Sequence, residues 1–124
     1  MLTKDEILAM KPGRELDELI MTKVMGWTKE ADHKPLPMWR DNNGFNVDRV
    51  VRFFNPSEDI SAAWEIVKIL REKGWATTLR IDSIVWCKLY GFGLGYFTCL
   101  GETAPEAICK TALICTLDGE SNGR

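Results

Sequence analysis

The stretch from Asn55 to Trp75 constrains the fold most, because a helix pattern ends there and a strand pattern follows it directly. Apolar residues recur in this stretch three and four positions apart, which places them on one face of a helix. Pro56 and Ser57 supply a start signal, and Gly74 can take the left-handed conformation that ends a helix. We therefore predict a helix that lies flat on a large apolar surface. Its apolar face consists of Ile60, Ala62, Ala63, Trp64, Ile66, Val67, Ile69 and Leu70.

After Gly74 the apolar residues alternate with a period of two, which is the repeat of a β-strand. This pattern predicts strands over residues 75–81, 84–90 and 94–100. The second strand is apolar on both sides, and such a strand is normally covered on both. We therefore expect an α/β (α+β) fold, namely an α/β/α sandwich in which helices above and below flank an antiparallel sheet of three or four strands. The two sides of the second strand are Val85, Cys87 and Leu89, and Ile84, Trp86 and Tyr90.

The remaining segments predict further helices and one long loop. Capping boxes at residues 3–6 and 103–106 begin two helices, and residues 14–25 form two short helical pieces or one kinked helix. Residues 28–48 lack periodicity and predict a loop, which at this length is often functional or mobile. Residues 47–54 predict a short strand or turn. We expect one domain over residues 1–118, with 28–48 as its long loop and 119–124 as a flexible tail.

Composition restricts the functional classes. The 124 residues are 45% apolar and 27% charged, and the net charge of −2 gives no electrostatic reason to expect nucleic acid. No apolar run approaches the roughly 20 residues that cross a bilayer. The N-terminus lacks the layout of a signal peptide. We therefore expect a cytoplasmic protein that binds neither nucleic acid nor membrane.

Motifs for catalysis or metal binding are missing from the sequence, so we expect no enzyme and no cofactor. No two cysteines have the two-residue gap of a zinc or redox motif, and we interpret them as buried thiols. His33 is the only histidine and cannot build a metal site from imidazoles. Most of the acidic residues considered as catalytic carboxylates lie at helix starts, where capping explains them. The cysteines are Cys87, Cys99, Cys109 and Cys115, and the acidic residues are Glu58, Asp59, Asp82 and Glu106.

Three segments together carry a family resemblance. They are ILAMKPGRELD at residues 7–17 with VMGW at 24–27, PSEDISAAW at 56–64, and ETAPEAICKTAL at 102–113. In these segments the chain resembles the phage ABA sandwich domain family, which comprises small proteins of tailed phages and prophages. The resemblance covers nearly the whole chain except residues 28–48. It implies a sheet between helix layers and a location in the host bacterial cytoplasm, and it implies no shared catalytic residues.

Basic and aromatic residues near position 50 form the most suggestive ligand patch. Guanidinium groups bind phosphates bidentately, and aromatic faces stack on nucleobases. In the alternative interpretation, Phe53 and Phe54 fill the edge of the core while the arginines face water. The patch consists of Arg49, Arg52, Phe53 and Phe54, with Trp39 and Arg40 upstream.

Arg80 and Lys88 are a second lead, because they interrupt otherwise apolar strands. They either snorkel at the sheet edge or reach an anion in a cleft between subunits. The glycines at positions 91, 93 and 95 lie between two predicted strands, so we interpret them as a hairpin rather than a phosphate-binding loop.

Three functional hypotheses follow. The first is a non-enzymatic phage accessory protein that binds a small phosphorylated ligand, such as a host nucleotide immune signal, and sequesters it against a defence pathway. The second is an interaction module that binds a host or phage protein through residues 28–48. The third, an enzyme, has no sequence feature in its favour. Five tryptophans and the two open edges of the predicted sheet also favour a homo-oligomer.

Overall fold

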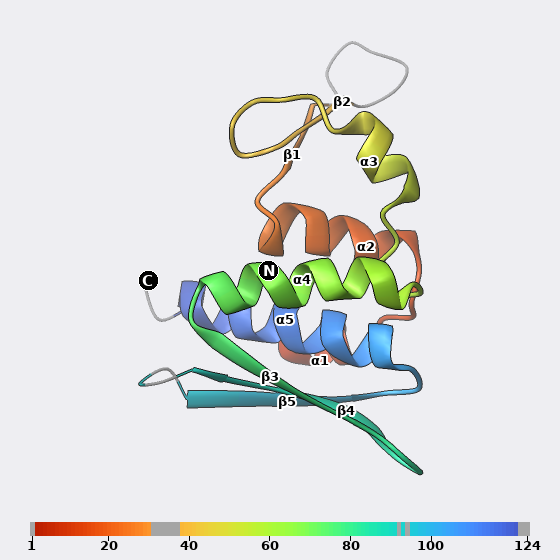
Figure 1. The fold of residues 1–124 in the computed structure, drawn as a ribbon, viewed down its shortest axis with the longest axis vertical. Coiled ribbons are helices and arrows are strands. Elements are labelled where there is room, and N and C mark those ends of the chain that lie inside the picture. Colours follow the sequence, from red (N-terminus) through yellow and green to blue (C-terminus); the bar gives the residue numbers. More distant parts are fainter. Residues whose placement is uncertain (1, 31–37, 92, 94, 122–124) are drawn as a thin grey trace.

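The computed structural model describes residues 2–30, 38–91, 93 and 95–121 (Figure 1). A three-stranded sheet lies at one end of the molecule, the helices are stacked over it, and a small lobe lies at the other end. The mixed helix-and-sheet class predicted from the sequence is confirmed. The elements in chain order are α1 (Lys4–Ala9), α2 (Arg14–Leu19), the π-helix η1 (Ile20–Val24), β1 (Thr28–Glu30), β2 (Met38–Arg40), α3 (Asp48–Phe53), α4 (Ile60–Glu72), β3 (Trp75–Ile81), β4 (Val85–Gly91), β5 (Gly95–Gly101) and α5 (Ala104–Ser121).

The main sheet is an antiparallel meander in the order β3-β4-β5. Trp75 pairs with Gly91 across the first hairpin, and Gly91 pairs with Gly95 across the second. All three strands lie within one residue of the ranges that the alternating pattern predicts. The pattern therefore locates the sheet and its turns correctly.

Helices cover one face of this sheet. Helix α5 contacts all three strands and α4 contacts β3, and Figure 1 places the helices on the same side. This differs from the expected helices above and below. The other side of β4 carries Trp86, Lys88 and Tyr90, which are large amphipathic side chains that lie against a surface while their polar ends reach water. A strand whose two sides both look apolar therefore does not need helices on both. One side can stay open when it consists of tryptophan, lysine and tyrosine.

Helix α5 is the centre of the core, because every side chain from Pro105 to Cys115 is buried. All four cysteines are free and buried, as the sequence predicts. The start of α5 lies against the end of β5, where a Cβ on Gly101 would come within 2.7 Å of the Ala107 backbone nitrogen. Gly101 is therefore required for this close approach rather than for a turn.

Helix α4 begins later than the sequence predicts. Its N-cap is Asp59, whose side chain accepts a hydrogen bond from the Ser61 amide at 3.0 Å. Ser57, predicted as part of the start signal, instead holds α2: its amide donates to Asp17 Oδ1 at 2.8 Å, and its hydroxyl accepts from the Gly13 amide at 2.9 Å. The presence of a serine before a helix therefore does not tell whether its side chain caps that helix or makes a tertiary contact.

The predicted loop at residues 28–48 is partly regular structure, which corrects the sequence interpretation. Strands β1 and β2 pair antiparallel, and Trp39 of β2 is buried. The segment predicted as a strand or turn contains the short helix α3 instead. Three-residue strands and a six-residue helix are too short to show a period, so the pattern misses them. Residues 31–37, with His33, and residues 122–124 of the predicted tail lie outside the described residues, whereas α5 continues to Ser121.

Candidate functional site

The predicted ligand-binding residues lie at two ends of the molecule (Figure 1). One group belongs to the lobe formed by β1, β2 and α3, the other lies on the three-stranded sheet, and the helices lie between them. The sequence-predicted residues therefore do not form a single site. The lobe carries Arg40, Arg49, Arg52, Phe53 and Phe54, and the sheet carries Arg80 and Lys88.

In the lobe, two of the aromatic residues are structural. Phe54 is only 7% exposed, and its ring lies 5.4 Å from the ring of Trp27. Trp39 is buried, with Lys29 Nζ 5.7 Å from its ring centroid. Both rings are buried, so Phe54 lies at the edge of the core, as the alternative interpretation expects, and its role as a ligand residue stays a prediction.

The arginines of the lobe have different surroundings. Arg40 donates from Nη1 to the Gly44 carbonyl at 2.9 Å, which fixes the turn after β2. Arg49 and Arg52 lie exposed on α3 beside Phe53, which is 74% exposed.

The side of the main sheet that faces away from the helices, called the outer face below, is the second surface. Alternation along the strands places nine side chains on it in three rows. Lys88 is central, between Thr78 and Thr98. The row on one side of it holds Ala76, Tyr90 and Tyr96, and the row on the other holds Arg80, Trp86 and Leu100.

Lys88 lies over an aromatic ring on this face. Its Nζ lies 4.7 Å from the centroid of the Tyr96 ring, a cation–π distance. Tyr96 is 64% exposed, and Tyr90 beside it is exposed as well. A cation with rings on adjacent strands can pair with an anion while the rings offer flat apolar surface. Sequence reasoning singled out Lys88 and missed its aromatic neighbours, although the strand alternation could have grouped them.

Arg80 lies in the row of the outer face next to Lys88, where it forms an ion pair with Asp82. Its Nε donates to Asp82 Oδ2 at 2.6 Å, and Asp82 also accepts from the Ile84 amide at 2.9 Å. The hydrogen bond from the Ile84 amide, and then that from Arg80, hold the pKa of the Asp82 carboxyl below its usual value. Asp82 thus orients the Arg80 side chain at the end of the first hairpin.

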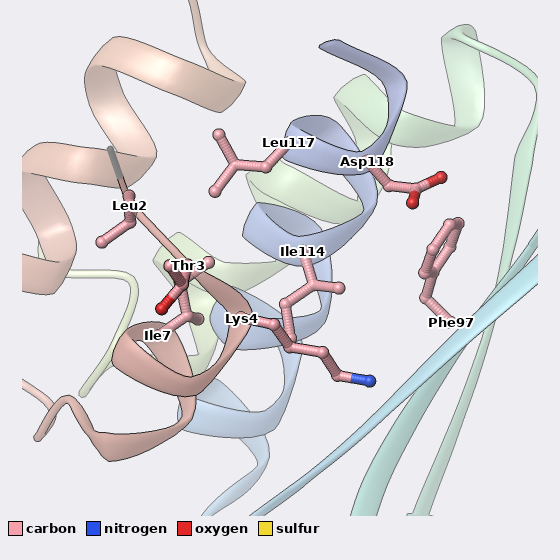
Figure 2. A pocket seen from close by; sticks show the side chains of 8 residues that line it. All are labelled: Leu2, Thr3, Lys4, Ile7, Phe97, Ile114, Leu117 and Asp118. Carbon is pink, nitrogen blue, oxygen red and sulfur yellow. The ribbon is translucent and has the colours of Figure 1, made fainter. Parts of the chain in front are cut away.

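A cavity of about 340 Å³ lies on the helix side of the sheet, between α1, α5 and β5 (Figure 2). Leu2 and Ile7 face Ile114 and Leu117 across it, and Phe97 closes it from β5. Thr3, Lys4 and Asp118 are its polar lining residues. Sequence reasoning missed this cavity, because each of its apolar residues also fits a core position.

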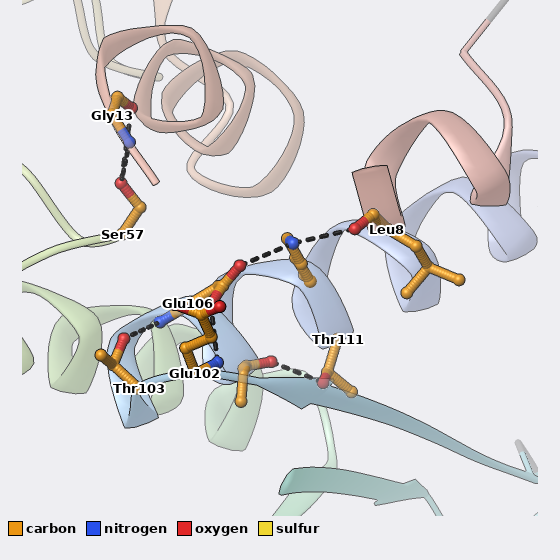
Figure 3. A network of polar contacts seen from close by, with 9 residues as sticks. Leu8, Gly13, Ser57, Glu102, Thr103, Glu106 and Thr111 are labelled. Carbon is orange, nitrogen blue, oxygen red and sulfur yellow. Dashed lines mark hydrogen bonds and ion pairs between the residues drawn. The ribbon is translucent and has the colours of Figure 1, made fainter. Parts of the chain in front are cut away.

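Polar groups buried near the start of α5 join this helix to α1 (Figure 3). Lys110 Nζ lies 2.7 Å from Glu106 Oε2 and donates to the Leu8 carbonyl at 3.0 Å, while the Glu102 amide donates to Glu106 Oε1 at 2.8 Å. Burial alone would raise the pKa of Glu106, but the hydrogen bonds from Lys110 and Glu102 outweigh it and lower that pKa. These partners give Glu106 a structural role at the start of α5.

The cysteines and carboxylates do not assemble a reactive centre in the part of the chain that the structure describes. Burial raises the pKa of the Cys87 thiol to about 11 and that of Cys115 to about 12, so both are protonated at neutral pH. No cluster of three His, Cys, Asp or Glu residues suited to a metal ion occurs among the described residues. Within the same residues, no helix is long and apolar enough to cross a membrane.

Comparison with protein families gives a match over most of the chain: the model of the phage ABA sandwich domain matches residues 18–113. The chain belongs to the phage ABA sandwich domain family. The resemblance inferred from the three sequence segments is therefore confirmed. The match includes the whole outer face and the β1-β2-α3 lobe.

One solved structure is similar to this phage ABA sandwich protein. It is the 2.0 Å crystal structure of a phage protein from Bacillus cereus ATCC 14579, with a TM-score of 0.66 and 26% sequence identity. The similarity covers 89% of this chain and 90% of that protein. A comparison with curated proteins gives no match. The comparisons therefore establish the family and fold and attach no activity to either surface.

Proposed function

We propose that this phage protein binds a small anionic ligand with an aromatic ring, of the nucleotide class, on the outer face of its sheet. The observation that carries the proposal is the position of Lys88, at the centre of an exposed face and 4.7 Å from the ring of Tyr96. Trp86 and Tyr90 supply further rings on adjacent positions, and Arg80, which is paired with Asp82, lies in the row beside Lys88. Charge pairing would fix the phosphate and stacking would hold the base.

The dimensions of the outer face suit such a ligand. Three strands of seven residues span roughly 23 Å by 14 Å, from a rise of 3.3 Å per residue and a spacing of 4.8 Å. A nucleotide fits within that area, with its phosphate near Lys88 and its base over a tyrosine.

The central charge also argues against the simplest competing occupant, a second copy stacked face to face. A twofold axis through the middle of the outer face would place Lys88 opposite its own counterpart, and like charges in direct contact are destabilising. An anion removes this conflict and neutralises the lysine.

In this proposal the protein sequesters its ligand without converting it. A phage benefits from such a protein when the ligand is a nucleotide signal of a host defence pathway.

The test is isothermal titration with adenosine mono- and triphosphate and with cyclic dinucleotides, on matched variants. Lys88→Met removes the central cation, whereas Lys68→Met removes an exposed lysine of α4 as the control. We expect Lys88→Met to weaken binding at least about tenfold, since hydrogen bonds to charged groups contribute about 1.5–3 kcal/mol. We expect Lys68→Met to bind as the unmodified protein does. Equal affinity in Lys88→Met, or no binding of any nucleotide at millimolar concentration, overturns the proposal.

The variant Arg49→Ala/Arg52→Ala separates the two surfaces, because it removes the exposed cations of α3 and leaves the sheet intact. The proposal predicts unchanged affinity for it. Loss of binding in this variant alone would assign the ligand to α3.

A second candidate function is docking of a host or phage protein on the lobe. The observation that favours it is the exposure of Phe45, Val50 and Phe53 beside two arginines, because aromatic and arginine residues are enriched at protein interfaces. Deleting residues 28–48 is not a clean test, since it removes buried Trp39. Phe45→Ser/Phe53→Ser keeps the core, and it should lose a partner that the unmodified protein captures from infected cells.

A further inference from the structure

We propose that a second copy of this chain pairs with β5 edge to edge, which joins two three-stranded sheets into one of six strands. The sheet order β3-β4-β5 leaves β5 as a terminal strand of the sheet in the described residues. Alternate residues of an antiparallel strand direct their N–H and C=O groups to the same side, so about half of these groups in β5 point toward the open edge.

The sequence of β5 lacks the features that protect an edge. Natural edges carry lysine, proline, bulges or very short strands. β5 has seven residues, Gly-Tyr-Phe-Thr-Cys-Leu-Gly, with neither a charge nor a proline. The other edge strand, β3, carries Arg80 and its ion pair with Asp82. The two edges therefore differ, and β5 is the one suited to pairing.

One register fits a twofold pairing of β5 best. With Thr98 on the axis all seven residues find a partner, whereas any other centre leaves residues at the ends unpaired. Thr98 then lies beside its own counterpart, and Tyr96 lies opposite Leu100 of the second copy. Threonine–threonine and aromatic–aliphatic pairs are both favourable across strands. Tyr96 and Leu100 are 64% and 62% exposed in the single chain, and this pairing covers part of each.

The charges on the outer face permit this arrangement, in contrast to face-to-face stacking. Each Lys88 is one strand away from β5, so the two lysines are three strand spacings apart, about 14 Å. That separation exceeds the Debye length of about 8 Å at physiological salt, so the repulsion is screened. The two outer faces become neighbours on one side of a continuous sheet.

Matched lysine substitutions test the inference in the absence of any ligand. Thr98 and Thr78 flank Lys88 in the same row, are both exposed, and differ only in the edge strand that carries them. Sedimentation equilibrium should give twice the chain mass of 14.1 kDa for the unmodified protein and for Thr78→Lys, and the monomer mass for Thr98→Lys. A monomeric unmodified protein, or dissociation by Thr78→Lys alone or equally by both variants, overturns the inference.

Cysteine substitution gives a second readout that does not depend on weakening the dimer. Opposed residues of an antiparallel pair have Cα atoms about 4.5–5.5 Å apart, within the range that a disulfide spans. Thr98→Cys should form a covalent dimer under mild oxidation, and Thr78→Cys should not. The opposite result places the contact at β3 and overturns the inference. Because both readouts are masses measured without nucleotide, failure of the ligand proposal leaves this inference unaffected.

Discussion

Replacing Lys110 with methionine removes the cation from a buried ion pair and keeps a side chain of similar length. In the folded protein Lys110 Nζ lies 2.7 Å from Glu106 Oε2 and donates to the Leu8 carbonyl at 3.0 Å. The two charged side chains are only 6% and 9% exposed. Lys110→Met therefore leaves the Glu106 carboxylate buried without its cation and removes a link between α1 and α5.

The expected loss of stability is large. Removing one partner of a buried ion pair costs about 3–5 kcal/mol. In a domain of this size that loss lowers the thermal midpoint by roughly 10–20 °C. Lys68→Met is the matched control, because Lys68 lies 3.6 Å from Glu65 in an exposed pair on α4. Exposed pairs contribute about 0–1 kcal/mol, so the control should unfold nearly as the unmodified protein does.

The loss should also depend on pH in a defined direction. The pKa of Glu106 is lowered in the folded protein, so its contribution to stability is present above the ordinary value of 4.5 and is lost as pH falls through the folded value. In Lys110→Met the protonated carboxyl is the better tolerated form. The difference in free energy of unfolding between the unmodified protein and Lys110→Met, measured by chemical denaturation, should thus be largest near pH 7 and should decrease below pH 4.5. A difference of less than about 1 kcal/mol at pH 7, or one that does not change with pH, would refute this reasoning.

Three further predictions concern the core. Gly101→Ala should lower the thermal midpoint by several degrees, because its Cβ would come within 2.7 Å of the Ala107 backbone nitrogen. Cys87 and Cys115 should resist iodoacetamide at pH 8 in the folded protein and react after denaturation, since burial raises the pKa of both thiols. Burial raises the pKa of Asp17 above 3.8, so stability conferred by its protonated form is lost as pH rises through the folded value. The free energy of unfolding of the unmodified protein, relative to that of Asp17→Asn, should therefore be highest at the acidic end of the pH range, which chemical denaturation of both proteins measures.

The sequence predicts the long elements well, because their periods have several residues in which to repeat. Helix α4, the three seven-residue strands and the capping box at Thr3 are all found in the structure. The predicted apolar face of α4 is wrong in part, because Ile60 and Trp64 are exposed. The small lobe was predicted as a loop, since β1 and β2 have three residues each. Whether a serine caps a helix or makes a tertiary contact, as Ser57 does, depends on which helix packs nearby. The local sequence does not contain this information.

The candidate site shows the same limit. Two positive charges on apolar strands, Arg80 and Lys88, were visible in the sequence as exceptions to the pattern. Strand alternation can group Trp86 and Tyr90 with Lys88, but which side of the sheet is open depends on helix packing, so the sequence does not show that this group is exposed. For the residues near α3, adjacency in sequence is misleading, because the helix ends at Phe53 and the backbone of Phe54 is extended. Phe53 faces solvent, whereas Phe54 packs on Trp27.

The central claim is that the outer face of the sheet holds a nucleotide-class ligand, and photo-crosslinking tests it most directly. The protein is irradiated with 8-azido-adenosine triphosphate, digested, and the labelled peptide is identified by mass spectrometry. Our account predicts label on β4 and β5, at or next to Tyr90 and Tyr96, that excess unlabelled nucleotide suppresses. Label confined to α3, or label that unlabelled nucleotide does not reduce, would contradict it.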